Sequence, residues 1–163
     1  MESLNASIRE YTTQLQYGQI QKAYKGIMTF MSSLKSFLEN RHPEYTVTGL
    51  YFGYMDMTYF AFTPMDLKQR NLKIAIVYLH EQNRFEIWLG GANRKVQAVY
   101  IERFKGKDLN GFTLSQVSPG VDSVIEMQLI ETPDFDHAEE LMLAIESKVV
   151  GFIKKVKELL LSE

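Results

Sequence analysis

The chain contains no cysteine, one tryptophan and only four prolines in 163 residues. The absence of cysteine excludes disulfides, thiolate nucleophiles, iron–sulfur clusters and cysteine-ligated zinc sites. Long apolar runs are also absent, because no window reaches the ~18 apolar residues that a membrane-spanning helix requires. We therefore expect a soluble, cytoplasmic protein with no membrane partner.

Neither sign of charge is in large excess. Lys and Arg number 18 and Asp and Glu number 20, which gives a formal net charge of −2. A dedicated nucleic-acid-binding domain is usually strongly basic, so we expect no nucleic-acid partner. The apolar fraction is 45%, and a chain of this length can bury about 70% of its unfolded surface without a metal or disulfide. The composition predicts a single domain over residues 1–163 and no cofactor.

The common catalytic signatures are missing as well. The chain has no Gly-x-Ser-x-Gly elbow, no phosphate-binding P-loop and no Gly-x-Gly-x-x-Gly fingerprint. Its three histidines, His42, His80 and His137, include no pair at the four-residue spacing that places two imidazoles on one helix face. His80 beside Glu81 could form an acid–base pair, although a histidine in a turn is more often simply solvated. These absences favour a protein that is not an enzyme.

Two helices are expected at the N-terminal end. Leu4, Ile8, Tyr11 and Leu15 have helical spacing, and a second series runs from Ile20 to Leu38 after a break near Gly18. The pattern predicts a helical hairpin that ends before Pro43 and packs its second helix on a sheet. The alternative is that this apolar seam forms the coiled coil of a homodimer.

Four strands are predicted to follow as an antiparallel meander. They are Tyr45–Tyr54, Met57–Phe62, Leu72–Leu79 and Arg84–Leu89. The third is almost continuously apolar, which is typical of a strand covered on both faces. In the fourth, Phe85, Ile87 and Leu89 alternate with Arg84, Glu86 and Trp88, so the first set is expected to be buried and the second only partly buried.

The remaining sequence predicts a helix, a fifth strand and a long C-terminal helix. Asn93 is the expected N-cap of the first of these helices. Residues 105–120 are predicted to be mostly loop, with a short strand at Phe112–Val117, and the fifth strand is expected over Val121–Ile130. A capping box at Asp136 and Glu139 predicts the start of the last helix. The fold class is therefore α+β, and the order of elements is weakly similar to that of restriction-endonuclease-like folds.

The best candidate for a binding site is the diglycine junction before the third predicted helix. Two glycines that leave a strand and open a helix expose backbone N–H groups at the positive end of the helix dipole, which favours an anion. The predicted ligand-binding residues are Gly90, Gly91, Asn93, Arg94 and Gln97, with Tyr78, Arg84 and Trp88 nearby. An ordinary strand-to-helix turn with solvated basic residues would show the same pattern. The leading hypothesis is a non-enzymatic binding module for a small anionic ligand or a protein partner.

The alternative is a metal-dependent hydrolase or phosphodiesterase on a modified endonuclease-like scaffold. Such a site would place Asp56, Glu86 and Glu126 around Mg²⁺. The expected Glu-x-Lys strand motif is absent, because Trp88 stands where the lysine is required. The simpler interpretation places Asp56 in a hairpin turn and the two glutamates on solvated strand faces.

Several segments of the sequence together carry a resemblance to a known family. They are residues 51–60, 72–80, 85–89, 120–126 and 133–135, which together extend over most of the chain. In these strings the chain resembles a family of uncharacterised bacterial proteins that is classed only as a domain of unknown function. The resemblance implies a bacterial source and a single-domain architecture, and it implies no activity or catalytic residue.

Overall fold

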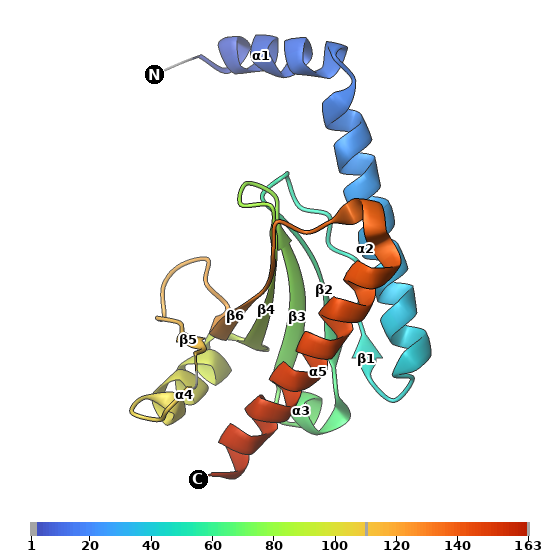
Figure 1. The fold of residues 1–163 in the computed structure, drawn as a ribbon. Helices are drawn as coiled ribbons and strands as arrows, with labels where there is room; N and C mark the ends of the chain where they lie inside the picture. Colours follow the sequence, from blue (N-terminus) through green and yellow to red (C-terminus); the bar gives the residue numbers. More distant parts are fainter. Residues whose placement is uncertain (1–2, 110, 163) are drawn as a thin grey trace.

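One antiparallel sheet forms the centre of the structure, a computed structural model (Figure 1). The structure describes residues 3–109 and 111–162. Residues 1–2 and 163, at the ends of the expected domain, and residue 110, in the predicted loop, lie outside the described residues. The strands are β1 (Thr46–Val47), β2 (Met57–Thr63), β3 (Leu72–Leu79), β4 (Arg84–Gly91), β5 (Thr113–Leu114) and β6 (Ser123–Glu131). The helices are α1 (Leu4–Gln16), α2 (Gln19–Arg41), α3 (Met65–Gln69), α4 (Arg94–Phe104) and α5 (Ala138–Leu161), with the short 3-10 turn η1 (Phe135–His137) before α5.

The sheet has the strand order β1-β2-β3-β4-β6-β5, and every neighbouring pair is antiparallel. The prediction of an α+β fold with an N-terminal helical pair, an antiparallel sheet and a long C-terminal helix is confirmed. The register pairs Tyr78 with Phe85 and Ala75 with Trp88. Since successive side chains of a strand point to opposite faces, Tyr78 and Trp88 lie on different faces of the sheet.

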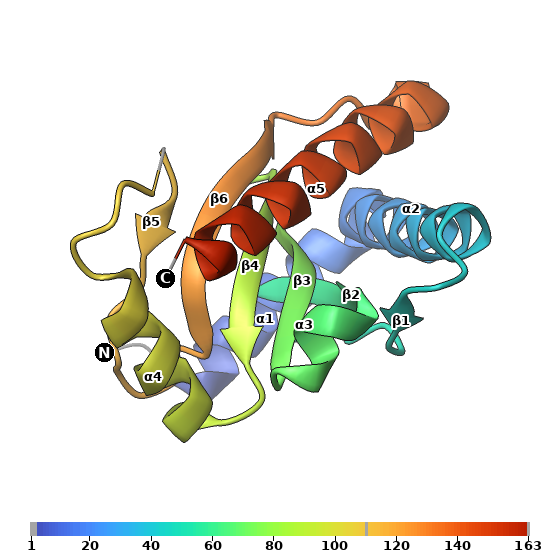
Figure 2. The same ribbon diagram turned by 90° about the horizontal axis from the view of Figure 1, so that it is seen from below.

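Large apolar side chains fill the space between the sheet and the helices. Phe60, Ile76 and Ile87 project from three adjacent strands and are fully buried with Leu34 of α2 and Val149 of α5. Figure 2 shows α2 and α5 on the same side of the sheet. We call this side the covered face and the opposite side the open face. Among the described residues, none of the helices has both the length and the apolar character needed to cross a membrane.

Helix α1 departs from the predicted packing. It begins at the N-cap Ser3, whose hydroxyl accepts a hydrogen bond from the Ala6 amide, but no residue of α1 is buried. Figure 1 shows α1 leaving the upper end of α2 at a sharp angle and lying apart from the sheet. The predicted pair of helices is present, but the two do not bury a common face, because the corner at Gly18, with φ of 78°, turns α1 away from α2.

Several boundaries also differ from the prediction, and β4 ends at Gly91 instead of Leu89. The strand expected over residues 45–54 is reduced to β1 and an isolated bridge between Tyr51 and Tyr59. The polar connection after β2 contains the short helix α3. Helix α5 begins at Ala138, and Asp136 does not cap it, because Asp134 accepts the Asp136 amide to close the preceding 3-10 turn.

Candidate functional site

The open face of the sheet holds a pocket of about 350 Å³. Strands β3 and β4 form its floor, and its walls come from β2, β6 and the loop before β6. Its lining residues are Met57, Tyr59, Lys73, Ala75, Val77, Trp88, Gly90, Gly120, Val121, Asp122, Ser123 and Glu126. We call this cavity the open-face pocket.

The pocket exists because small and large residues are paired across β3 and β4. Ala75 lies opposite Trp88, and Gly90 lies opposite Lys73. The alkyl chain of Lys73 passes over Gly90, since a Cβ atom added at Gly90 would lie 3.2 Å from the Lys73 Cε. Large side chains therefore rise beside residues with almost no side chain, and this leaves a depression between them.

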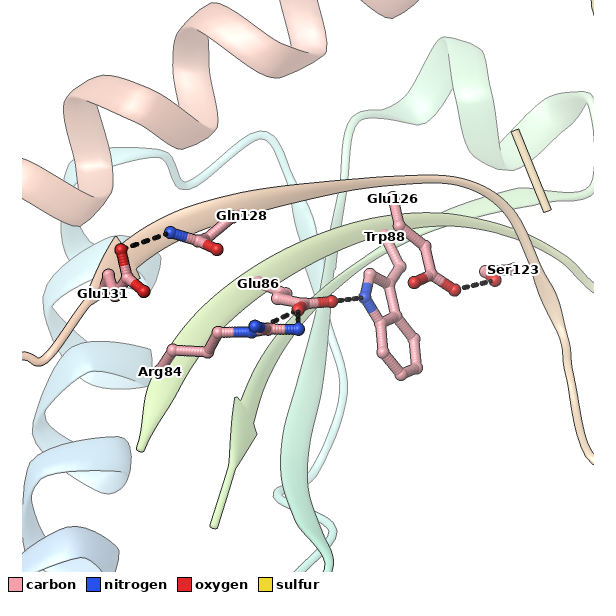
Figure 3. Close-up of polar contacts among 7 residues, drawn as sticks. All are labelled: Arg84, Glu86, Trp88, Ser123, Glu126, Gln128 and Glu131. Carbon is pink, nitrogen blue, oxygen red and sulfur yellow. Dashed lines mark hydrogen bonds and ion pairs between the residues drawn. The ribbon is translucent and has the colours of Figure 1, made fainter. Parts of the chain in front are cut away.

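A buried carboxylate fixes the indole ring in the pocket wall (Figure 3). Glu86 is 6% exposed, and its Oε2 accepts hydrogen bonds from Arg84 Nε at 2.7 Å and Nη2 at 2.6 Å. Its Oε1 accepts the Trp88 Nε1–H at 2.8 Å. Figure 3 shows all three side chains on the side of the sheet away from α5. Both carboxylate oxygens are thus occupied, and Trp88 is held in one orientation.

Charged groups of both signs lie around the pocket. Glu126 accepts the Ser123 hydroxyl at 2.5 Å, and Ser123 also contacts the Ser115 hydroxyl at 2.7 Å. Burial raises the pKa of the Tyr59 phenol, with smaller contributions from Tyr51 and the negative charge of Asp122. The Lys73 ammonium forms no hydrogen bond or ion pair with the described part of the chain. It is the pocket's available cation.

Comparison with known proteins identifies the family. The family model DUF7000, described as a domain of unknown function, matches residues 4–160. The chain belongs to the DUF7000 family. No curated protein and no solved structure matches it significantly. The matched range includes every residue of the open-face pocket, so the whole pocket lies within the DUF7000 domain.

The predicted diglycine junction of this DUF7000 domain is occupied by contacts within the chain. Gly90 and Gly91 are the last two residues of β4, and the Gly91 amide donates to the Asp122 carbonyl at 3.4 Å. Asn93 caps α4 by accepting the Val96 amide at 2.9 Å. Gln97 donates to the Val121 and Ser123 carbonyls at 2.7 and 3.0 Å. These groups hold α4 against the loop before β6, which leaves few donors free for an anion at the junction.

The other predicted binding residues do not share one surface. Arg94 lies at the start of α4, where its Nη1 donates to the Ser118 carbonyl at 3.4 Å. Tyr78 is on the covered face and donates its hydroxyl to Asn83 at 2.7 Å. Arg84 and Trp88 are on the open face, and of the predicted set only Trp88 and Gly90 line the open-face pocket.

The predicted set of binding residues did not include Lys73, Tyr59 or Asp122. The signal was present in the alternation of β2 and β3, because residues 57 and 59 share one face of a strand and residues 73, 75 and 77 share the same face of the next. Only the pairing register shows that these two sets lie side by side with Trp88.

The carboxylates of the hydrolase hypothesis lie in separate environments. Asp56 accepts the Tyr54 amide at 2.9 Å in the turn before β2, and the amides of Tyr54 and Met57 lower the pKa of its carboxyl. The prediction that Glu86 lies on a solvated face is wrong, because Arg84 and Trp88 enclose it. In the described ranges, no group of three His, Asp or Glu residues is placed to hold a metal ion.

Proposed function

We propose that this DUF7000 protein is a non-enzymatic binding module that holds a small anionic ligand in the open-face pocket. One observation supports the proposal above all: the ammonium of Lys73, which has no partner among the residues that the structure describes, lies at a pocket lined by Trp88 and Tyr59. An anionic group bound there would form a charge-assisted hydrogen bond, which is roughly twice as strong as a neutral one. The volume of about 350 Å³ is within the range of about 300–1,000 Å³ common for ligand sites.

The fixed position of Trp88 supports binding of a flat or apolar ligand body. Its indole N–H is already bonded to Glu86, so the ring presents its apolar surface to the pocket. A side chain that is held in place before binding loses little conformational entropy when the ligand arrives. Ala75 and Gly90 leave room for the ligand between this ring and the strand backbone.

The acids of the pocket restrict the charge of the ligand. Asp122 and Glu126 lie in the lining with a single lysine, so a molecule with several negative charges would meet repulsion. A ligand with one carboxylate and one or more hydrogen-bond donors fits both signs of charge, because the donors can reach these acids. We therefore favour a small monocarboxylate over a nucleotide or another polyphosphate.

The pocket supports binding more than hydrolysis. Glu86, the buried acid nearest Trp88, uses both oxygens within the fold, where they accept three hydrogen bonds from Arg84 and Trp88. Glu126 is oriented by Ser123, and Asp56 is fixed in a turn. No observation favours the metal-dependent hydrolase over the binding module.

The single tryptophan allows binding to be measured directly. Trp88 emission should change on titration with small monocarboxylates that carry a hydrogen-bond donor, such as glycolate, lactate and 3-hydroxybutyrate, and the protein should gain thermal stability by mass action. Lys73→Gln should weaken binding about 10-fold or more, which corresponds to the loss of one charged hydrogen bond. Lys68→Gln, on the exposed surface of α3, is the matched control.

Two results would remove the proposal. One is that none of these carboxylates, nor inorganic phosphate, changes either the emission of Trp88 or the melting temperature. The other is that a ligand binds equally well to the parent protein and to Lys73→Gln. Ala75→Leu provides a second test, because it fills the floor of the pocket without changing any charge. This variant should also weaken ligand binding.

A further inference from the structure

Helix α1 carries an apolar stripe that nothing in the described chain covers. Leu4, Ile8 and Tyr11 are 76%, 48% and 57% exposed, and with the partly buried Leu15 they form a single line along the helix at the spacing i, i+4, i+7, i+11. Helices as short as this are marginal alone in water and usually depend on packing of their apolar face. The stripe therefore requires a partner surface.

A groove of about 850 Å³ lies along α2 on the same molecule. One wall comes from α2, with Ile27 and Phe30, and the other from η1 and the start of α5, with Phe135 and Met142. Tyr78 lies between the walls. We call this cavity the helix groove, and its apolar lining matches the apolar stripe of α1.

The dimensions of the stripe and the groove agree. Helix α1 has 13 residues and is therefore about 20 Å long at 1.5 Å per residue. The α2 wall extends from Gln19 to Ser33, which corresponds to about 23 Å. The midpoint of this wall is Gly26, where an added Cβ would meet no atom within 4 Å, so another helix can approach closely there.

The α1 helix of the same chain is held away from the groove. The Gln21 side chain donates to the Leu15 carbonyl at 2.8 Å, and the Gly18 amide donates to the same carbonyl at 3.1 Å. These bonds fix the corner between the helices, and α1 leaves α2 at a sharp angle (Figure 1). In the described chain, the apolar stripe of α1 and the helix groove are therefore of similar length and are not in contact with each other.

We propose that two copies of the chain form a symmetric dimer in which each α1 lies in the helix groove of the other copy. A two-fold axis makes the two contacts identical and leaves neither stripe exposed. Each stripe and the groove surface beneath it would bury roughly 700 Å², so two contacts bury roughly 1,400 Å², which is within the standard range for stable complexes.

Cysteine cross-linking tests the contact directly, because the parent chain has no cysteine. Ile8 is near the middle of the stripe and Gly26 is in the middle of the groove wall. Under oxidation, a mixture of Ile8→Cys and Gly26→Cys proteins should give a disulfide-linked dimer. A mixture of Thr13→Cys and Gly26→Cys is the control, since Thr13 lies on the opposite side of α1 from the stripe.

Light scattering after gel filtration measures the assembly itself. The parent should be a dimer, and Ile8→Glu should weaken dimerisation by ~100-fold or more because each dimer would bury two carboxylates in apolar grooves. Thr13→Glu adds the same charge outside the contact and should remain dimeric. Circular dichroism should show that both variants are folded, as expected for changes at exposed positions.

The proposal is overturned by any of three outcomes. The parent is monomeric at all concentrations tested, the dimer is insensitive to Ile8→Glu, or the mixed cysteine proteins do not cross-link. If a single chain with both cysteines gives an internal disulfide while the mixture gives none, α1 closes on its own groove. None of these outcomes depends on ligand binding at the open-face pocket.

Discussion

Replacing Glu86 with glutamine should loosen the open-face pocket and destabilise the protein. The buried carboxylate accepts two hydrogen bonds from Arg84 and one from Trp88. Glutamine has nearly the same shape but keeps only one acceptor oxygen, and its NH₂ group must face one of the two donors. Either the guanidinium or the indole N–H then loses its partner.

The magnitude follows from the exposure of each group. Hydrogen bonds to charged groups contribute about 1.5–3 kcal/mol, and an unsatisfied buried donor costs about 1–3 kcal/mol. The Arg84 side chain is 33% exposed, so water can replace part of its lost interaction, and this reduces the loss. We expect the free energy of unfolding to fall by about 2 kcal/mol, or about 4–8 °C in melting temperature for a domain of this size.

Urea unfolding followed by the fluorescence of Trp88 measures both effects at once. The folded-state emission should shift in Glu86→Gln, because the indole loses its fixed partner, and the unfolding midpoint should fall. Glu131→Gln is the matched control, since Glu131 is exposed and receives only a 3.4 Å contact from Gln128. If Glu86→Gln unfolds within about 0.5 kcal/mol of the parent, as surface substitutions do, the carboxylate is not what holds Trp88.

Four further predictions concern other parts of the fold. Burial lowers the pKa of His80 below its ordinary value of about 6.5. As the pH falls below about 6.5, His80 takes up a proton in the unfolded chain before it does so in the folded chain, and this favours unfolding. The contribution of His80 to stability is therefore complete above that pH and is lost below it. His80→Asn should therefore flatten the decline in urea midpoint below about pH 6.5, and equal slopes would contradict the argument. Gly91→Ala should destabilise by about 2 kcal/mol or more, because its Cβ would lie 2.6 Å from a main-chain nitrogen of α4. By contrast, Gly151 is at an exposed position of α5 with no atom near an added Cβ, so Gly151→Ala should stabilise the protein by about 0.5–1 kcal/mol, and thermal unfolding measures both glycine variants. The Arg41 hydrogen bond holds the pKa of the Glu146 carboxyl below its usual range, which gives stability that is present above the unfolded pKa of about 4.3 and lost below it. Glu146→Gln should lower the free energy of unfolding by about 1 kcal/mol at neutral pH, and by no more than that because the Arg41 side chain is 52% exposed and the ion pair is screened by solvent. If the difference between Glu146→Gln and the parent stays the same in acid, the ion pair is not its cause.

Most element types of this fold were predictable from periodicity. The series of apolar residues in α2 and α5 extends over several turns, and β4 alternates clearly between Phe85, Ile87 and Leu89 and their polar neighbours. Such patterns are long enough to outweigh local exceptions. The short elements were not predictable in the same way, because β1 has two residues and α3 has five, too few for any period to appear.

The direction of α1 could not be predicted, because its sequence has the stripe of a helix that packs against a neighbour. The stripe predicts that α1 packs against an apolar surface, but it does not indicate whether that surface belongs to the same chain or to another one. The corner depends on the Gly18 conformation and on the Gln21 side chain, which are specific local contacts with no periodic signal. A hairpin within the chain and a contact between two chains have the same sequence pattern.

The apolar run of β3 explains why the pocket was hidden in the sequence. A continuous run predicts a strand covered on both faces, and Ala75 and Val77 of the open face are indeed buried. The two faces of β3 are covered in different ways. Helices pack on the covered face, whereas Tyr59 and Trp88 from the neighbouring strands line the open face. Side chains that arise from the sheet itself cannot fill the space over Ala75 and Gly90 as a helix would. The same aromatic residues that bury β3 therefore leave the cavity beside it. Glu86 maintains the shape of the cavity, because its hydrogen bond holds the Trp88 ring in one orientation.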